Sequence, residues 1–251
     1  CDFVVDVNNA GLTDVARTPG GDLFFGAAVT LHELAGNPLV TGFADGAISY
    51  AAAHCGNRPV RSTATVGGNL CNALPSADMA PVLLALDATC YIADEDSQES
   101  LPLDDFFVGP RQTVLEDRLL VGVALPGTCA GRRCLSRKLT RSAEDISLVQ
   151  VAVALGLDEG RVQEARIALG AVAPVPMRAT LAETMLAGLE VGAVTPEVLN
   201  DVANIAGGEC EPLDDHRASE DYRRDMVKVL TRRLLARLLA DGSGNGEGGA
   251  A

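Results

Sequence analysis

The chain has 251 residues, 47% of them hydrophobic and 22% charged, which is typical of a globular protein with one or two domains and a buried core. Its formal net charge of −14 argues against binding to a nucleic acid or to an anionic membrane surface. No apolar run reaches the length of a membrane span and no signal peptide is visible, so we expect a cytoplasmic protein with no membrane partner.

In the first half of the chain, short apolar or alternating runs predict strands separated by short helices. The strands are expected at Phe3–Val7, Leu23–Ala27, Thr89–Ala93 and Leu119–Leu125. Helices are expected at Leu31–Ala35, Asp45–His54 and Ala77–Leu86. Thr30 and Glu33 have the spacing of a capping box for the first helix. Because the chain begins within a strand pattern and without an initiator methionine, we expect a further segment upstream of Cys1.

The second half predicts three longer strands followed by helices. The strands are expected at Leu135–Thr140, Ser147–Leu157 and Val162–Ala171, with a tight turn at Asp158–Arg161. The strand pattern stops near Pro174, and Thr195 and Pro196 then have the pattern of a helix start.

The final helix has the clearest pattern. Ser219 is expected to cap it and Gly242 to end it. Its core-facing stripe is expected to consist of Met226, Val229, Leu230, Leu234 and Leu238, with the six basic residues on the opposite, solvated face. Residues 241–251 are rich in glycine, and we expect a disordered tail there.

Strands followed by helices indicate an α+β protein of two units that divide near Pro126–Arg132. We place the first domain at residues 1–128 and the second at residues 132–240. The seven cysteines are odd in number and irregular in spacing, which argues against a disulfide framework. Cys129 and Cys134 have no second close pair to complete a metal site, so we expect reduced thiols and no metal.

Two adjacent glycines, Gly67 and Gly68, follow the strand-like run Thr63–Val66. Without a Cβ, backbone N–H groups can approach a ligand closely, and successive N–H groups form a concave site for an anion. Asp78 is placed to accept hydrogen bonds from sugar hydroxyls, as acidic residues do in dinucleotide sites. The same residues also fit a tight structural turn with Asp78 as a helix cap, and both interpretations stay open at this point.

The stretch VRSTATVGGNLCNALPSADMAPVLLALDA resembles the second flavin-binding segment of the FAD subunit in the xanthine dehydrogenase/molybdenum hydroxylase family. That family shows the pattern (I/V)R-x-x-A-(T/S)-(I/V)-GGN-x-x-(N/T)-A-x-P-x-(A/S)-D. Further landmarks follow in the family's order: LPLDDFFVGPRQTVLEDRLLVGVALP, SRKLTRSAEDISLVQVAVAL, ARIALGAVAPVPMRA and DDHRASEDYRRDMVKVLTRRLLARLL. The resemblance therefore extends over nearly the whole chain.

This resemblance implies a vanillyl-alcohol-oxidase (PCMH)-type FAD-binding domain, followed by a C-terminal α+β domain like that of CO dehydrogenase flavoproteins, with a small antiparallel sheet and helices. The family's first phosphate loop should lie upstream of Phe3–Val7, and nothing in the chain matches it. We therefore expect an FAD-binding domain that is incomplete at its N-terminus, and weak FAD binding by the chain alone.

Carried over residue by residue, the resemblance implies two groups of FAD contacts. Thr65, Gly67, Gly68 and Asn69 match positions at the pyrophosphate and the ribityl chain, and Asp78 matches a contact to a sugar hydroxyl.

The second group lies around the flavin ring. Leu120 matches an apolar and backbone contact, and Lys138 matches a cation that favours the reduced, anionic ring. Ile146 ends a loop that reaches over one face of the ring in the family. Cys55 matches a position beside the ring, although a thiol there also fits a simple core residue. No residue of the chain is expected to act on the organic substrate.

The implied function is an FAD-carrying electron-transfer subunit of a heterotrimer. A large partner would hold molybdopterin and a small partner 2Fe–2S clusters, and electrons would pass through FAD to NAD or another acceptor. The stretch NLCNALPSAD is more similar to purine and nicotinate hydroxylases than to carbon-monoxide dehydrogenases. The alternatives are the flavin subunit of a carbon-monoxide or aromatic-CoA enzyme, and a flavin-free structural or assembly subunit.

Overall fold

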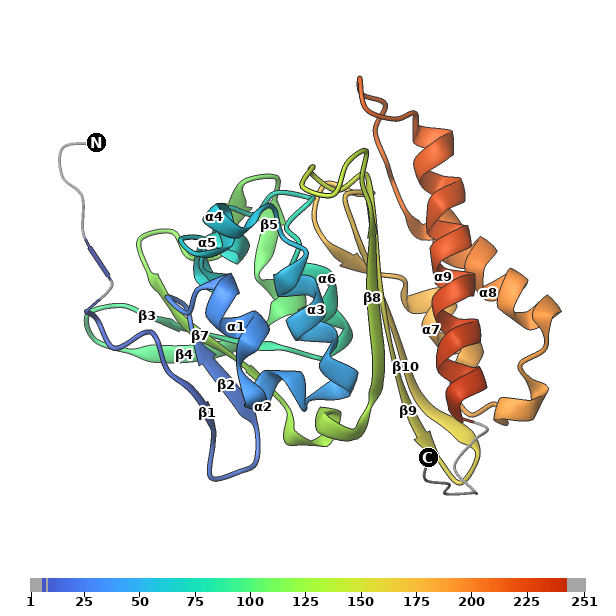
Figure 1. Cartoon of the computed structure of the whole chain (residues 1–251), viewed down its shortest axis with the longest axis horizontal. Helices are drawn as coiled ribbons and strands as arrows, with labels where there is room; N and C mark the ends of the chain where they lie inside the picture. The colour runs from blue at the N-terminus through green and yellow to red at the C-terminus, as the bar shows by residue number, and fades with distance from the viewer. Residues whose placement is uncertain (1–5, 8, 243–251) are drawn as a thin grey trace.

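The computed structural model describes residues 6–7 and 9–242, and these form successive layers of sheet, helices, sheet and helices (Figure 1). We call the part up to Pro126 the first lobe and the part from Gly127 the second lobe.

The first lobe is built on a five-stranded antiparallel sheet with the strand order β1-β2-β7-β3-β4. Its strands are β1 (Val15–Arg17), β2 (Leu23–Gly26), β3 (Thr89–Ala93), β4 (Gln98–Pro102) and β7 (Leu119–Leu125), with a separate pair β5 (Phe107–Gly109) and β6 (Gln112–Thr113). Its helices are α1 (Leu31–Gly36), α2 (Pro38–Thr41), η1 (Ala44–Gly46), α3 (Ala47–Ala53), α4 (Arg58–Arg61), α5 (Val66–Cys71), α6 (Ala80–Ala85) and η2 (Leu103–Asp105).

The second lobe is built on a four-stranded antiparallel sheet with the order β11-β10-β9-β8. Its elements are η3 (Gly127–Gly131), β8 (Arg133–Leu139), β9 (Val149–Asp158), β10 (Arg161–Gly170), β11 (Met177–Arg178), α7 (Thr180–Leu186), η4 (Val191–Ala193), α8 (Pro196–Glu209) and α9 (Glu220–Gly242). None of the helices in residues 6–7 and 9–242 is long and apolar enough to cross a membrane.

Both faces of the second sheet are covered, and the residues of β9 differ between the two faces. Val151 and Val153 point to the core under α7 and α9, whereas Ala152 and Ala154 belong to the core that includes the first lobe. Successive side chains of a strand point to opposite faces of the sheet, so the valines and the alanines of β9 lie on different faces. The helices on the alanine face can pack closer to the sheet than those on the valine face. The alanine face lets α3 and α6 of the first lobe pack directly on the sheet (Figure 1).

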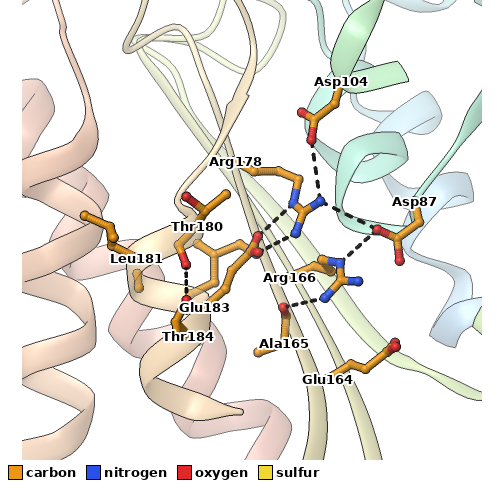
Figure 2. Close-up of polar contacts among 12 residues, drawn as sticks. Asp87, Asp104, Glu164, Ala165, Arg166, Arg178, Thr180, Leu181, Glu183 and Thr184 are labelled. Atoms are coloured by element: carbon orange, nitrogen blue, oxygen red, sulfur yellow. Dashed lines mark hydrogen bonds and ion pairs between the residues drawn. The ribbon is translucent and has the colours of Figure 1, made fainter. Parts of the chain in front are cut away.

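An ion-pair network also joins the lobes, next to the end of α6 (Figure 2). Asp87 accepts hydrogen bonds from Arg166 Nε at 2.8 Å and from Arg132 Nη1 at 2.6 Å. Arg178 Nη1 lies 3.8 Å from the same carboxylate and pairs with the buried Glu183, whose Oε1 is 3.0 Å from Arg178 Nε. Burial would raise the pKa of Asp87, but the hydrogen bonds from Arg166 and Arg132 outweigh it and hold that pKa below its usual value.

Several sequence expectations are confirmed. The strands at Thr89–Ala93 and Leu119–Leu125 have the expected bounds. Thr30 and Glu33 form a complete capping box at α1. The antiparallel three-strand core of the second lobe and its turn before Arg161 are present. The α+β class predicted from the order of strands and helices is therefore correct.

Other expectations are wrong in instructive ways. The run Thr63–Val66 is no strand, because Thr65 makes only an isolated bridge to Thr30 and α5 begins at Val66. The helix expected from Asp45 begins at Ala47, after Asp45 and Gly46 adopt positive φ angles. The helix expected at Ala77–Leu86 covers only Ala80–Ala85.

Several elements were missed, and most of them are short. They are β1, α2, α4, α5, β4, β5, β6, α7 and β11, the last of which lies beyond the expected end of the strands near Pro174. The strand expected at Phe3–Val7 falls mostly outside the described residues, and Asp6 and Val7 are not in a strand. The tail expected at 241–251 lies outside the described residues from 243 onward.

The final helix begins as expected, with Ser219 Oγ accepting from Tyr222 N at 3.2 Å, and it extends to Gly242, the last residue that the structure describes. The buried face, however, is rotated from the expected stripe. Leu234 and Leu238 are buried, but Met226, Val229 and Leu230 are only half-buried, and the rest of the buried face is Arg223, Val227, Thr231, Leu235 and Leu239.

Arg223 is therefore not on the solvated face. It is 3% exposed, and its guanidinium donates to Leu148 O at 2.6 Å and to Asp215 Oδ1 at 2.9 Å. This arginine ties α9 to the start of β9 instead of facing solvent.

Candidate functional site

The glycine pair lies in the first turn of the short helix α5, not in a free turn. Thr65 caps the helix, because its Oγ1 accepts from Gly68 N at 3.0 Å. Gly67 N donates to Ala27 O at 2.8 Å. Both glycine N–H groups are thus satisfied within the chain, and the expected concave row of free N–H donors is not formed by them.

What the two glycines supply is space. A Cβ on Gly67 would lie 2.7 Å from Ala27 Cβ and 2.8 Å from Ala27 O, so this position requires glycine for α5 to pack against the loop after β2. A Cβ on Gly68 would meet only Thr65 Oγ1, at 3.1 Å, and would otherwise project into open space. Gly67 is therefore required for the packing of α5, whereas Gly68 keeps the surface of the site free of a side chain.

The open space beside Gly68 is a cavity of about 380 Å³. Thr65, Gly67, Gly68 and Leu120 all line it, together with Val7, Leu12, Ala27, Ala28, Cys71, Leu115, Arg118 and Leu119. The cavity is thus bounded by α5 on one side and by the start of β7 on the other. Four of the sequence-predicted FAD contacts meet here, and the missing Cβ of Gly68 leaves room for a ligand against the backbone.

Asn69 connects this cavity to the next group of residues. Its side-chain Oδ1 accepts a hydrogen bond from Met79 N at 3.1 Å, at the start of α6. Met79 occupies the N-cap position of α6, with no capping side chain of its own. Asp78, the residue before it, is therefore not the helix cap, and its carboxylate points elsewhere.

The Asp78 carboxylate lies in a polar cluster at the junction of the lobes. Lys138 Nζ is 3.3 Å from Oδ1 and 3.4 Å from Oδ2, and Ser147 Oγ donates to Oδ1 at 2.9 Å. Gln150 Nε2 also donates to Oδ1 and, at 2.9 Å, to Ser147 Oγ. The side chains of Asp78 and Lys138 are 13% and 12% exposed, so this ion pair is largely shielded from water.

Cys55 belongs to the same cluster. The residue is 8% exposed and lies close enough to Asp78 to feel its charge. Burial, followed by the charge of Asp78, raises the pKa of Cys55 to about 12. The group is therefore a neutral thiol at neutral pH, suited to packing and to a weak hydrogen bond but not to nucleophilic chemistry.

Ile146 lies apart from the first cavity. It is 38% exposed and lines a second cavity of about 390 Å³, together with Leu74, Pro110 and the neighbouring Ser147. The loop before it is held by an ion pair between Arg141 Nε and Asp145 Oδ2 at 2.8 Å, and Glu144 reaches Asn57 of the first lobe at 3.4 Å.

The structure thus sorts the nine sequence-predicted site residues. Thr65, Gly67, Gly68 and Leu120 meet at the first cavity, Cys55, Asp78 and Lys138 meet at the lobe junction, Asn69 links the two, and Ile146 borders the junction from the second cavity. Sequence reasoning missed Arg118, Ser147 and Gln150. Gln150 could have been found only from its cross-strand pairing with Lys138, and that pairing cannot be known without the register of β8 and β9.

Two family models match the chain. Residues 1–128 match the FAD binding domain in molybdopterin dehydrogenase, and residues 136–238 match the CO dehydrogenase flavoprotein C-terminal domain.

Relatives and solved structures match over nearly the full chain. The glyceraldehyde dehydrogenase medium chain of Sulfolobus acidocaldarius is 30% identical, over 93% of this chain and 82% of its own. The xanthine dehydrogenase FAD-binding subunit of Escherichia coli O157:H7 is 29% identical, over 96% of this chain and 82% of its own. A carbon monoxide dehydrogenase structure from Hydrogenophaga pseudoflava superposes with a TM-score of 0.85 at 29% identity, over 91% of this chain and 78% of the other.

Proposed function

Because this chain belongs to the family of FAD-binding subunits of molybdopterin dehydrogenases, we propose that it passes electrons from the iron–sulfur clusters of a small partner through FAD to NAD or another acceptor. The relatives are FAD-containing subunits of multi-subunit molybdenum oxidoreductases, whose partner subunits carry molybdopterin and 2Fe–2S clusters. The six cysteines that the structure describes are free thiols, which supports a reducing, cytoplasmic setting for this step.

The observation that supports the proposal most strongly is the cavity at Gly68 and its neighbourhood. A ligand that extends along the backbone of Gly68 and along Leu120 would contact a mostly apolar wall. Beyond Asn69 and the start of α6 it would contact the ion pair of Asp78 and Lys138 at the lobe junction. These features fit an extended molecule with an apolar ring system and a hydroxylated chain. We therefore assign Thr65, Gly67, Gly68 and Asn69 to the wall beside the pyrophosphate and ribityl chain. Gly68 leaves room there for the ligand, whereas the N–H groups of Gly67 and Gly68 are used within the chain and Gly67 holds α5 in place.

At the junction, we assign Asp78 to a sugar hydroxyl and Lys138 to the flavin ring, with Cys55 and Ile146 on its borders. When bound, FAD accepts electrons from an iron–sulfur cluster and delivers them to the acceptor. The Lys138 ammonium favours negative charge on a neighbouring group, and its 3.3 Å contact to Asp78 fixes its position. Leu120, 2% exposed in β7, excludes water from the cavity wall.

Which compound is hydroxylated depends on the whole complex and not on this chain. The relatives include subunits of enzymes that act on glyceraldehyde, xanthine, carbon monoxide and nicotine. We propose a purine or nicotinate compound as the substrate class, by the likeness of the NLCNALPSAD stretch. A carbon monoxide dehydrogenase is the second candidate, because a structure of that enzyme superposes on this chain with a TM-score of 0.85.

The proposal is tested on the complex of this chain with its partners, in which substrate-driven reduction of NAD and of an artificial acceptor is measured with xanthine, nicotinate or carbon monoxide as the reductant. Complexes that contain the Gly68→Val subunit should still have their iron–sulfur clusters reduced by the substrate, but should fail to reduce NAD. Unchanged NAD reduction in a complex shown to contain no flavin would overturn the proposal.

A further inference from the structure

We propose that Ser147 and Gln150 of the second lobe are positioning residues that orient the Asp78 carboxylate toward FAD. The inference rests on the proposed function, since it concerns the same site. It extends the part of the second lobe in FAD binding beyond Lys138 and Ile146 to two residues that do not contact the first cavity.

The first argument is the division of donors between the two carboxylate oxygens of Asp78. Oδ1 accepts from Ser147 Oγ, from Gln150 Nε2 and from Lys138 Nζ, whereas Oδ2 has only Lys138 Nζ, at 3.4 Å. A carboxylate oxygen has room for about two acceptor directions. The side chain is therefore held by one oxygen, and within the described part of the chain the other keeps acceptor capacity for a hydroxyl donor of a ligand.

The second argument is the order of the hydrogen bonds. Gln150 donates to both Ser147 Oγ and Asp78, and Ser147 in turn donates to Asp78. A serine hydroxyl that accepts one hydrogen bond can direct its own proton along the next, so amide, hydroxyl and carboxylate form a chain with one sense. This arrangement leaves Asp78 little freedom to rotate.

The third argument is the sheet that holds Gln150. Lys138, Gln150 and Gly170 are direct neighbours across β8, β9 and β10, and therefore share one face, the face turned to the first lobe. A Cβ on Gly170 would lie 2.4 Å from Gln150 Oε1 and 2.8 Å from Pro81 Cγ. The amide is thus wedged between the bare backbone of Gly170 and α6, with its NH₂ group directed at Asp78.

The fourth argument is that Gln150 destabilises the fold. Gln150 is 3% exposed, and its Oε1 has no hydrogen-bond partner among the described residues. A buried polar atom without a partner destabilises a protein, and an apolar side chain of similar volume would avoid that cost. Gln150 is thus not what stability alone requires at this position, which fits a residue whose amide serves Asp78.

A double-mutant cycle tests the inference by FAD titration into the flavin-stripped complex of this chain with its partner subunits. Gln150→Leu alone should raise the FAD dissociation constant by about tenfold, because Asp78 is then no longer oriented to accept its hydrogen bond from FAD. In the Asp78→Ala background the same change should have less than about a twofold effect, because the group that it positions is gone. Gln163→Leu, on the exposed part of β10, is the matched control and should bind FAD normally.

Thermal unfolding of each variant is measured alongside, because a purely structural role would lower Tm and would weaken FAD binding equally in both backgrounds. Multiplicative effects of Gln150→Leu and Asp78→Ala, or unchanged affinity in a folded Gln150→Leu complex, would overturn the inference while the proposed function stands. If Gln150→Leu does not fold, Ser147→Ala enters the same cycle and is judged by the same criterion. Failure of the unmodified complex and of the control to bind FAD would instead overturn the proposed function, and the inference with it.

Discussion

Substitution of Gly68 should separate FAD binding from folding. A Cβ at this position meets only Thr65 Oγ1, at 3.1 Å, and Gly68 lines the first cavity. In Gly68→Ala, the gain in helix propensity is about 1 kcal/mol, and displacement of the Thr65 cap costs about the same. We therefore expect the free energy of unfolding to change by less than about 1 kcal/mol.

The effect on FAD should be much larger, because the added atoms occupy the space assigned to the ligand. We expect Gly68→Ala to weaken FAD binding by at least about tenfold, equivalent to 1.4 kcal/mol, and Gly68→Val by more than about a hundredfold. The assay is FAD titration into the flavin-stripped complex, followed by the quenching of flavin fluorescence, with urea unfolding of the same samples.

Gly67→Ala is the matched control. Its Cβ would lie 2.8 Å from Ala27 O, the acceptor of the Gly67 N–H, so the strain falls on the fold. The expected loss is about 1–3 kcal/mol of unfolding free energy. FAD affinity equal to that of the unmodified chain in a folded Gly68→Val complex would refute the assignment of this cavity.

Three further predictions concern charged residues. Asp87→Asn should lower the free energy of unfolding by about 2–3 kcal/mol at pH 7, because Arg166 and Arg132 then face a neutral amide in place of their ionised partner. Since the folded-state pKa of Asp87 is lowered, this difference should persist above about pH 4 and shrink as the pH falls below it, as urea unfolding across pH will show. Asp78→Ala should weaken FAD binding by about 1–3 kcal/mol in a titration, and unchanged affinity would remove this residue from the site. Arg223→Met should lower the free energy of unfolding by about 2–4 kcal/mol, measured by thermal or urea unfolding. Arg233→Met, at an exposed position of the same helix, should change it by less than about 0.5 kcal/mol, and equal effects would contradict the burial of Arg223.

The elements that could be predicted from the sequence are those whose signal is local. The capping box of Thr30 and Glu33 satisfies its own helix start, and the long runs of β7, β9 and β10 show their strand character without help from distant residues. Thr63–Val66 looks like a strand by residue type, but its backbone is held by contacts to the loop after β2, including Val66 N to Val29 O at 3.0 Å. Such tertiary contacts override a short β-type run.

The same distinction applies to the site. The glycine pair and Asp78 could be found from the motif, but which N–H groups are free depends on the Ala27 carbonyl and the Thr65 hydroxyl. Gln150 gave no sequence signal, because its role depends on the register of β8 and β9 and on the packing of α6 against β10. The face of α9 was misjudged because the buried Arg223 replaces an apolar residue in the helical period.

The flavin content of the purified complex tests the central assignment most directly. The complex is denatured, and the released FAD is quantified against the amount of this chain, for the unmodified protein and for Gly68→Val in parallel. The account predicts one FAD for each copy of the unmodified chain and almost none in Gly68→Val, although both complexes contain folded subunits. Equal FAD content in the two complexes would contradict the site, and no FAD in the unmodified complex would contradict the function.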